Sequence, residues 1–186
     1  MSRSLRFTRW ALSFALVAFC VGGQGTSLAA SRNALDRDVD AALKALYDDS
    51  PTAKALAGNA KGILVFPSIV KAGFVVGAQG GDGALIKKGR KVGYYNASAV
   101  SVGLQAGAQK FGFAIFFMSD AAMSSFEKSK GFEVGVGPTV VVVDAGAAKD
   151  INTLTAKSDV YAFVFGQKGL MAGVGLQGTK ITRLTP

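Results

Sequence analysis

The sequence predicts an α+β fold, in which a curved, mostly antiparallel β-sheet (a partial barrel or sandwich) is covered by N-terminal helices and one internal helix. Three observations lead to this class. Helical spacing of apolar residues is confined to residues 31–58 and 121–130. Short apolar runs separated by glycine-rich segments fill the rest of the chain. Glycine provides 24 of 186 residues, nearly twice its usual share of about 7%, which indicates tight turns and close backbone approaches.

The helical arm is expected over residues 31–58. Apolar positions in its first part recur at spacings of three and four, at Leu35, Val39, Leu43 and Leu46. Ser50 followed by Pro51 is typical of a cap and a first helical position, so a second short helix should begin there and end at Gly58.

The β-rich body is expected over residues 61–184, interrupted by a helix over residues 121–130. That helix should be capped by Ser119 or Asp120 and stopped by Gly131. The candidate strands are Ile63–Phe66, Gly73–Gln79, Ala84–Lys87, Val92–Tyr95, Val100–Ala108, Phe111–Met118, Glu133–Val143, Val160–Phe165, Met171–Gln177 and Lys180–Leu184. Hairpin turns are expected at residues 80–83 and 88–90. Glycines four apart, such as Gly73 and Gly77, share one strand face and clear it for a close crossing.

Residues 1–30 are typical of a secretory signal peptide. A basic start precedes the apolar stretch Trp10–Val21, and small residues prepare a cleavage after Ala29. This predicts export to the periplasm, with association to the outer membrane left open, and one domain over residues 31–186. Cys20 could accept a lipid, but Phe19 stands where the processing enzyme prefers a small residue, so ordinary cleavage is favoured.

The residues give little indication of a catalytic site or a cofactor site. The chain has no histidine, which excludes Ser-His-Asp mechanisms and most zinc sites. Residues 173–178 match G-x-G-x-x-G, but only eight residues follow and none is acidic, so a dinucleotide site is not expected. Asp36, Asp38 and Asp40 lack the glycine and glutamate of a calcium loop and should form a solvated helix face. We therefore expect no enzyme, no cofactor and no metal.

Positive charge is the remaining signal, with 21 Lys and Arg against 12 Asp and Glu. Its densest part is the basic turn, residues 87–91. One interpretation is a charged turn that keeps sheet edges soluble. The other is a contact for anionic head groups, where each cation near the surface adds about 1 kcal/mol. The residues alone favour the first interpretation. The candidate head-group contacts are Lys61, Lys71, Lys87, Lys88, Arg90 and Lys91.

Three ordered segments carry a resemblance to a known family. They are AKGILVFPSIVKAGFVVG at residues 60–77, SVGLQAGAQ at residues 101–109 and QKGLMAGVGLQG at residues 167–178. Together they resemble the SYLF domain, a lipid-binding domain shared by yeast actin-patch proteins, plant FYVE proteins and many exported bacterial proteins. The likeness extends over roughly residues 54–184. It implies a β-rich domain with packed helices that binds anionic phospholipids and carries no catalytic residue.

The chain departs from the eukaryotic SYLF pattern in its N-terminal helix. In the eukaryotic members of the family that this chain resembles, a basic amphipathic helix makes the membrane contact. The corresponding helix of this chain has three basic and five acidic residues. Anionic lipid should repel it, so we assign it to packing and lipid contact to the basic residues, with Phe74 or Phe111 entering the interface.

The expected function is a non-enzymatic phospholipid-binding module of the bacterial cell envelope. Neither nucleic acid nor actin is an expected partner of an exported chain. One alternative is a structural or protein-interaction domain of the periplasm or outer membrane. Another, an outer-membrane barrel, fits poorly with continuous apolar runs such as Ala114–Met118, because these suit strands buried on both faces.

Overall fold

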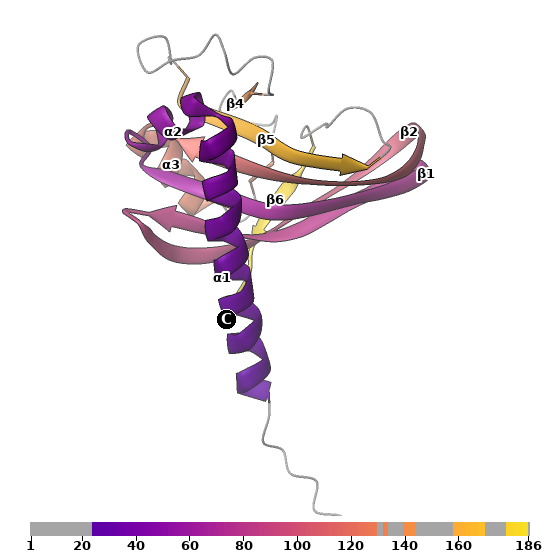
Figure 1. Ribbon diagram of the computed structural model, residues 1–186, viewed down its shortest axis with the longest axis horizontal. Helices are drawn as coiled ribbons and strands as arrows, with labels where there is room; N and C mark the ends of the chain where they lie inside the picture. The colour runs from indigo at the N-terminus through magenta and orange to yellow at the C-terminus, as the bar shows by residue number, and fades with distance from the viewer. Residues whose placement is uncertain (1–23, 130–131, 134–139, 144–157, 170–177, 186) are drawn as a thin grey trace, which may run out of the picture.

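The computed structural model describes residues 24–129, 132–133, 140–143, 158–169 and 178–185. In these residues it confirms the α+β class, with a curved, open, six-stranded sheet and three helices (Figure 1). The described strand pairs are antiparallel except for β4 (Val140–Val143) and β5 (Val160–Gly169), which run parallel. A mostly antiparallel sheet was therefore the correct prediction.

The sheet is built around one long hairpin. Strands β1 (Gly62–Lys87) and β2 (Arg90–Phe117) pair along almost their whole length, from Gly62 opposite Phe117 to Lys87 opposite Arg90. The first six predicted strands merge into these two. The predicted turn at residues 88–90 is confirmed, since Lys88 and Gly89 both have positive φ, at 50° and 73°. Two such residues form the kind of turn that matches the right-handed twist of a hairpin.

The turn predicted at residues 80–83 is wrong, because these residues lie inside β1. Gly81 faces the carbonyl oxygen of Ser68 and the side chain of Ile69, and Gly83 faces the carbonyl oxygen of Val65. A side chain at either position would collide with backbone. The two glycines thus let β1 fold back closely over its own first half, which is a packing role and not a turn.

Strand β2 is the centre of the sheet. Along the edge opposite β1, residues 109–117 pair with β5 and residues 95–98 pair with β6 (Lys180–Arg183). β3 (Phe132–Glu133) extends the sheet beyond β6.

Some of the predicted elements lie outside the described residues. These are the middle of the predicted 133–143 strand, the predicted 171–177 strand, and the G-x-G-x-x-G motif apart from Gly178.

The helices cover the end of the hairpin where its tip and its two outer ends come together. α1 (Gln24–Asp49) crosses the outer face of the sheet and passes through the predicted cleavage position after Ala29, and α2 (Pro51–Ala57) follows it (Figure 1). The Ser50 hydroxyl caps α2 by accepting a hydrogen bond from the Ala53 amide. α3 (Asp120–Lys128) is capped by Ser119, as predicted, and Gly131 lies outside the described residues. None of the described helices combines the length and apolar character needed to cross a membrane.

Two buried clusters hold these layers together. Inside the curve of the sheet, Phe66 stacks on Phe113 with ring centroids 4.8 Å apart, and Phe126 of α3 packs against Tyr95 and Phe117. On the outer face, Val39 and Leu46 of α1 lie in one cluster with buried sheet residues. The assignment of α1 to packing agrees with this arrangement.

Candidate functional site

Three of the six predicted head-group contacts are held in ion pairs. Lys87 Nζ lies 2.7 Å from Glu127 Oε1 of α3, and Lys91 Nζ lies 2.7 Å from Asp40 Oδ1 of α1. Lys61 Nζ lies 3.7 Å from Asp120 Oδ2. Each pair joins the hairpin region to a helix. Much of the predicted positive charge is therefore already balanced within the protein.

Lys71 lies far from the basic turn and is 9% exposed. Lys71 lies two residues after Ile69 and therefore shares the inner face of β1 with it. It stands opposite Gln109, whose buried Oε1 accepts no hydrogen bond from the described residues. The structure thus separates Lys71 from the other candidates. Phe111, expected to enter a lipid interface, is 1% exposed and belongs to the inner cluster, so that expectation is wrong.

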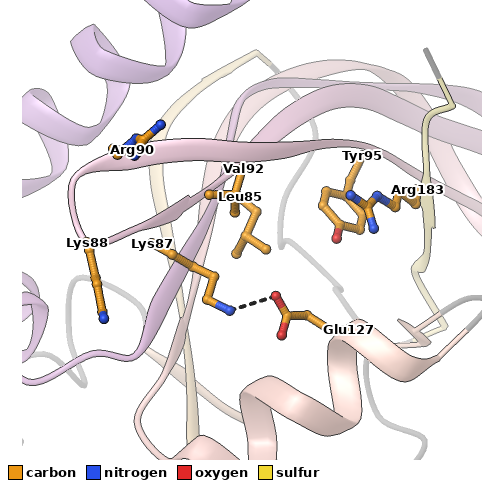
Figure 2. A pocket seen from close by; sticks show the side chains of 8 residues that line it. All are labelled: Leu85, Lys87, Lys88, Arg90, Val92, Tyr95, Glu127 and Arg183. Atoms are coloured by element: carbon orange, nitrogen blue, oxygen red, sulfur yellow. Dashed lines mark hydrogen bonds and ion pairs between the residues drawn. The ribbon is translucent and has the colours of Figure 1, made fainter.

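The other two candidates, Lys88 and Arg90, are exposed at the tip of the hairpin. Among the described residues, neither has a carboxylate within ion-pair distance. Figure 2 shows their side chains leaving the turn in different directions, while Lys87 reaches toward Glu127. The tip therefore presents a spread of charge and not a converging cage.

A pocket of about 480 Å³ lies beside the tip (Figure 2). Its lining residues are Leu85, Lys87, Lys88, Arg90, Val92, Tyr95, Glu127 and Arg183. A second hollow of about 660 Å³ shares Lys87, Lys88 and Glu127 with it and adds Lys61. With four cations and one carboxylate, the first pocket favours an anionic occupant.

Arg183 is the cation of this pocket that was not predicted from the sequence. It comes from β6, which pairs with β2 so that Arg183 stands opposite Tyr95. No local motif joins residue 183 to the basic turn almost a hundred positions earlier. Only the pairing of β6 with β2 brings them together.

Tyr95 remains a neutral phenol at this site. Burial raises its pKa above the ordinary value of 10.0, and among nearby charges Arg183 opposes this rise while Glu127 adds to it. A protonated hydroxyl can donate to an anionic oxygen. Figure 2 shows this side chain next to Arg183.

The acidic face of α1 fastens the helix to β2. Asp36 accepts a hydrogen bond of 3.1 Å from the Tyr94 hydroxyl, and Asp40 pairs with Lys91. Arg32 lies 5.4 Å from the centre of the Tyr94 ring. The expectation of a merely solvated face was wrong for Asp36 and Asp40, because their partners on β2 are remote in sequence.

Comparison with known proteins finds a similar family. Residues 98–185 match a family model described as Ysc84, a Las17-binding protein and actin regulator. Over this segment the chain is similar to the SYLF, or Ysc84, family. Similar proteins include the human and orangutan SH3 domain-containing YSC84-like protein 1, each 29% identical over 126 residues. That alignment covers 65% of this chain and 36% of each relative, so the chain spans about a third of their length.

The resemblance to SYLF proteins noted in the sequence is thereby confirmed. The SYLF family is a binding-type domain family, and the likeness to it supports a lipid-binding or actin-related domain. The matched segment includes Glu127 and Arg183 of the pocket, whereas the six candidate cations at residues 61–91 precede it. Among the described residues, no group of three or more acidic or cysteine side chains is arranged to hold a metal ion.

Proposed function

We propose that this chain binds anionic phospholipid surfaces through the tip of the β1–β2 hairpin, without catalysing a reaction. The observation that carries the proposal is the charge of Lys88 and Arg90, which no carboxylate in the described part of the chain pairs, at the rim of a pocket that also holds Arg183. All three cations lie at one end of the protein, beside α3.

The divergence of the tip side chains favours an extended anionic surface over a single small ligand. Cations that point in different directions can each meet a separate phosphate of a lipid layer. Each contributes about 1 kcal/mol near such a surface. Contact of this kind weakens as salt screens the charges.

The expected export of the chain agrees with this proposal. A basic and then apolar N-terminal segment would carry it into the bacterial envelope, where anionic phospholipid head groups are accessible. We assign no cofactor to the proposed function, since electrostatic adhesion requires none.

The experiment is co-sedimentation of the chain with vesicles of phosphatidylglycerol and phosphatidylcholine at low and high salt. Lys88→Glu with Arg90→Glu should weaken binding about 30-fold or more, because two contributions of about 1 kcal/mol are lost and repulsion is added. The matched control is Arg37→Glu with Lys54→Glu, which makes the same charge change at exposed positions on α1 and α2. Equal binding by both double variants would reject the hairpin tip as the site.

A gain of binding provides a test that misfolding cannot imitate. Glu127→Gln removes the carboxylate that holds Lys87 at 2.7 Å and leaves the shape of the pocket unchanged. The freed ammonium should increase affinity for phosphatidylglycerol vesicles several-fold at low salt. Unchanged or weaker binding would show that the pocket is not part of the contact.

A protein-interaction role is the second candidate, and the family description favours it by naming a Las17-binding actin regulator. It predicts recovery of a defined protein partner by the purified chain, with no sedimentation on any vesicle. The vesicle experiment therefore separates the two candidates.

A further inference from the structure

The far end of the β1–β2 hairpin is a sharp bend. Both strands turn back together at the right of Figure 1, away from α2 and α3. The pairing register breaks between Phe74 and Val76, and Gly73 lies directly against Gly77. On β2, Gly107 has a φ of 135°, which residues with side chains rarely adopt. We call this region, residues 70–78 with 100–110, the bend.

Among the side chains that the structure describes, the outer face of the bend is apolar and exposed. Phe74 is 79% exposed and Val100 is 76% exposed, and Val70 and Val76 are each more than half exposed. The exposed alanines Ala72, Ala78 and Ala108 lie between them. The buried cluster under α1 and α2 uses sheet residues such as Val65 and Phe116 but none from the bend. A continuous exposed apolar area of this kind marks an interaction surface.

Two lysines flank this apolar face. Lys110 of β2 stands opposite Lys168 of β5, and both side chains are exposed. Lys110 also stands opposite Val70 of β1, at the margin of the apolar face. In the described part of the chain, neither lysine has a carboxylate within ion-pair distance. Like charges placed directly opposite each other weaken a strand pair. The arrangement therefore does not stabilise the fold, whereas it would favour the binding of an anionic partner.

We propose that the outer face of the bend inserts into a phospholipid layer. Phe74, Val76 and Val100 would enter the apolar region, and Lys110 and Lys168 would meet phosphate groups at its surface. Apolar side chains rimmed by cations are the combination that holds proteins at a membrane interface. The bend lies at the end of the β1–β2 hairpin away from α3 (Figure 1), whereas the basic pocket is lined by the hairpin tip and by Glu127 of α3. One chain would therefore hold two lipid surfaces, one at each end; this second step rests on the function proposed above.

Insertion is tested with a single tryptophan in the full chain. Trp10, the one natural tryptophan, is replaced by Phe, and Phe74→Trp is introduced. Phosphatidylglycerol vesicles should shift the tryptophan emission to the blue, and brominated acyl chains should quench it. Ala41→Trp, at an exposed position on α1, should show neither effect. An emission of Phe74→Trp that vesicles leave unchanged overturns insertion. A blue shift that rises with protein concentration alone overturns it in favour of self-association.

Joining of two surfaces is tested by the light scattering of vesicle suspensions. The wild-type chain should cluster the vesicles. Phe74→Ser with Val100→Ser should still sediment with them at low salt but lose most of the increase in scattering, whereas Leu184→Ser, an exposed apolar position outside the bend, should retain it. Sedimentation without clustering by the wild-type chain would overturn this inference and leave the proposed function standing. Failure of every form to sediment would overturn both.

Discussion

The two ends of the β1–β2 hairpin share a backbone arrangement but differ in what covers them. At the covered end, helices α1, α2 and α3 lie over both faces, and ion pairs such as Lys91–Asp40 fasten them to the strands. At the bend, the outer face carries Phe74 and Val100, and none of the three described helices buries them. The difference shows that the apolar residues of one hairpin serve two purposes. Those at the covered end hold the fold together, while those at the bend are available for contact with a partner.

The largest expected effect separates the two ends directly. Phe116 is fully buried under α1, with its ring centroid 5.0 Å from that of Phe163. Phe116→Ala should lower the free energy of unfolding by about 3–5 kcal/mol, because a cavity replaces the ring. Phe74→Ala at the bend should change it by about 0.5 kcal/mol or less. Urea denaturation of both variants measures the contrast, and a large loss for Phe74→Ala would show that the bend is covered after all.

A smaller loss is expected where β1 folds over itself. A Cβ at Gly83 would collide with the carbonyl oxygen of Val65, so Gly83→Ala should cost about 1–3 kcal/mol through forced backbone shifts. Gly80→Ala is the matched control, since its Cβ would meet its nearest neighbour, the carbonyl oxygen of Ala97, at an ordinary 3.5 Å. Equal denaturation midpoints for the two variants would mean that Gly83 and the backbone of Val65 are not in close contact.

The interior at the bend should respond in the opposite direction. In the described part of the chain, the Lys71 ammonium has neither a hydrogen bond nor an ion pair, although the residue is 9% exposed. Lys71→Met should raise the free energy of unfolding by about 1 kcal/mol, because burying an unpaired polar group is unfavourable. Lys54→Met, at an exposed position of α2, should have almost no effect. A lower free energy of unfolding for Lys71→Met would contradict the claim that burial of the Lys71 ammonium is unfavourable.

The smallest effect concerns the attachment of α1 at the covered end. A double-mutant cycle of Lys91→Ala and Asp40→Ala should give a coupling energy of about 0.5 kcal/mol at low salt. The side chains of Lys91 and Asp40 are 19% and 65% exposed, so salt should reduce this coupling. A coupling that high salt leaves unchanged would indicate a contact shielded from solvent.

The elements that the sequence predicted correctly are those determined by neighbouring residues. Ser50 and Ser119 act on amides three residues later, and the Lys88–Gly89 turn connects strands on either side of it. The turn predicted at residues 80–83 was wrong because glycine occurs both in turns and where two backbone segments approach closely. Which role applies depends on Val65 and Ser68, more than ten residues earlier.

The candidate site was predictable only in its composition. The cations of the basic turn are visible in the sequence, but their neutralisation is not, since Glu127 lies forty residues after Lys87 and Asp40 lies fifty-one before Lys91. Arg183 enters through strand pairing. Lys71 looks like the other basic candidates until the alternation of β1 turns it inward. Tertiary pairing, which no local pattern contains, decides each of these cases.

The nested pairing of β1 with β2 has a consequence for synthesis. Gly62 leaves the ribosome early, yet its partner Phe117 follows only after both strands have been made. Until then β1 carries apolar runs along an edge that nothing has paired, which is a state prone to wrong association. Once the Lys88–Gly89 turn forms, each new pair brings the next within reach, so that closure proceeds outward from the turn at little entropic cost. The turn that displays the cations would thus also set the order in which the nascent chain acquires its sheet.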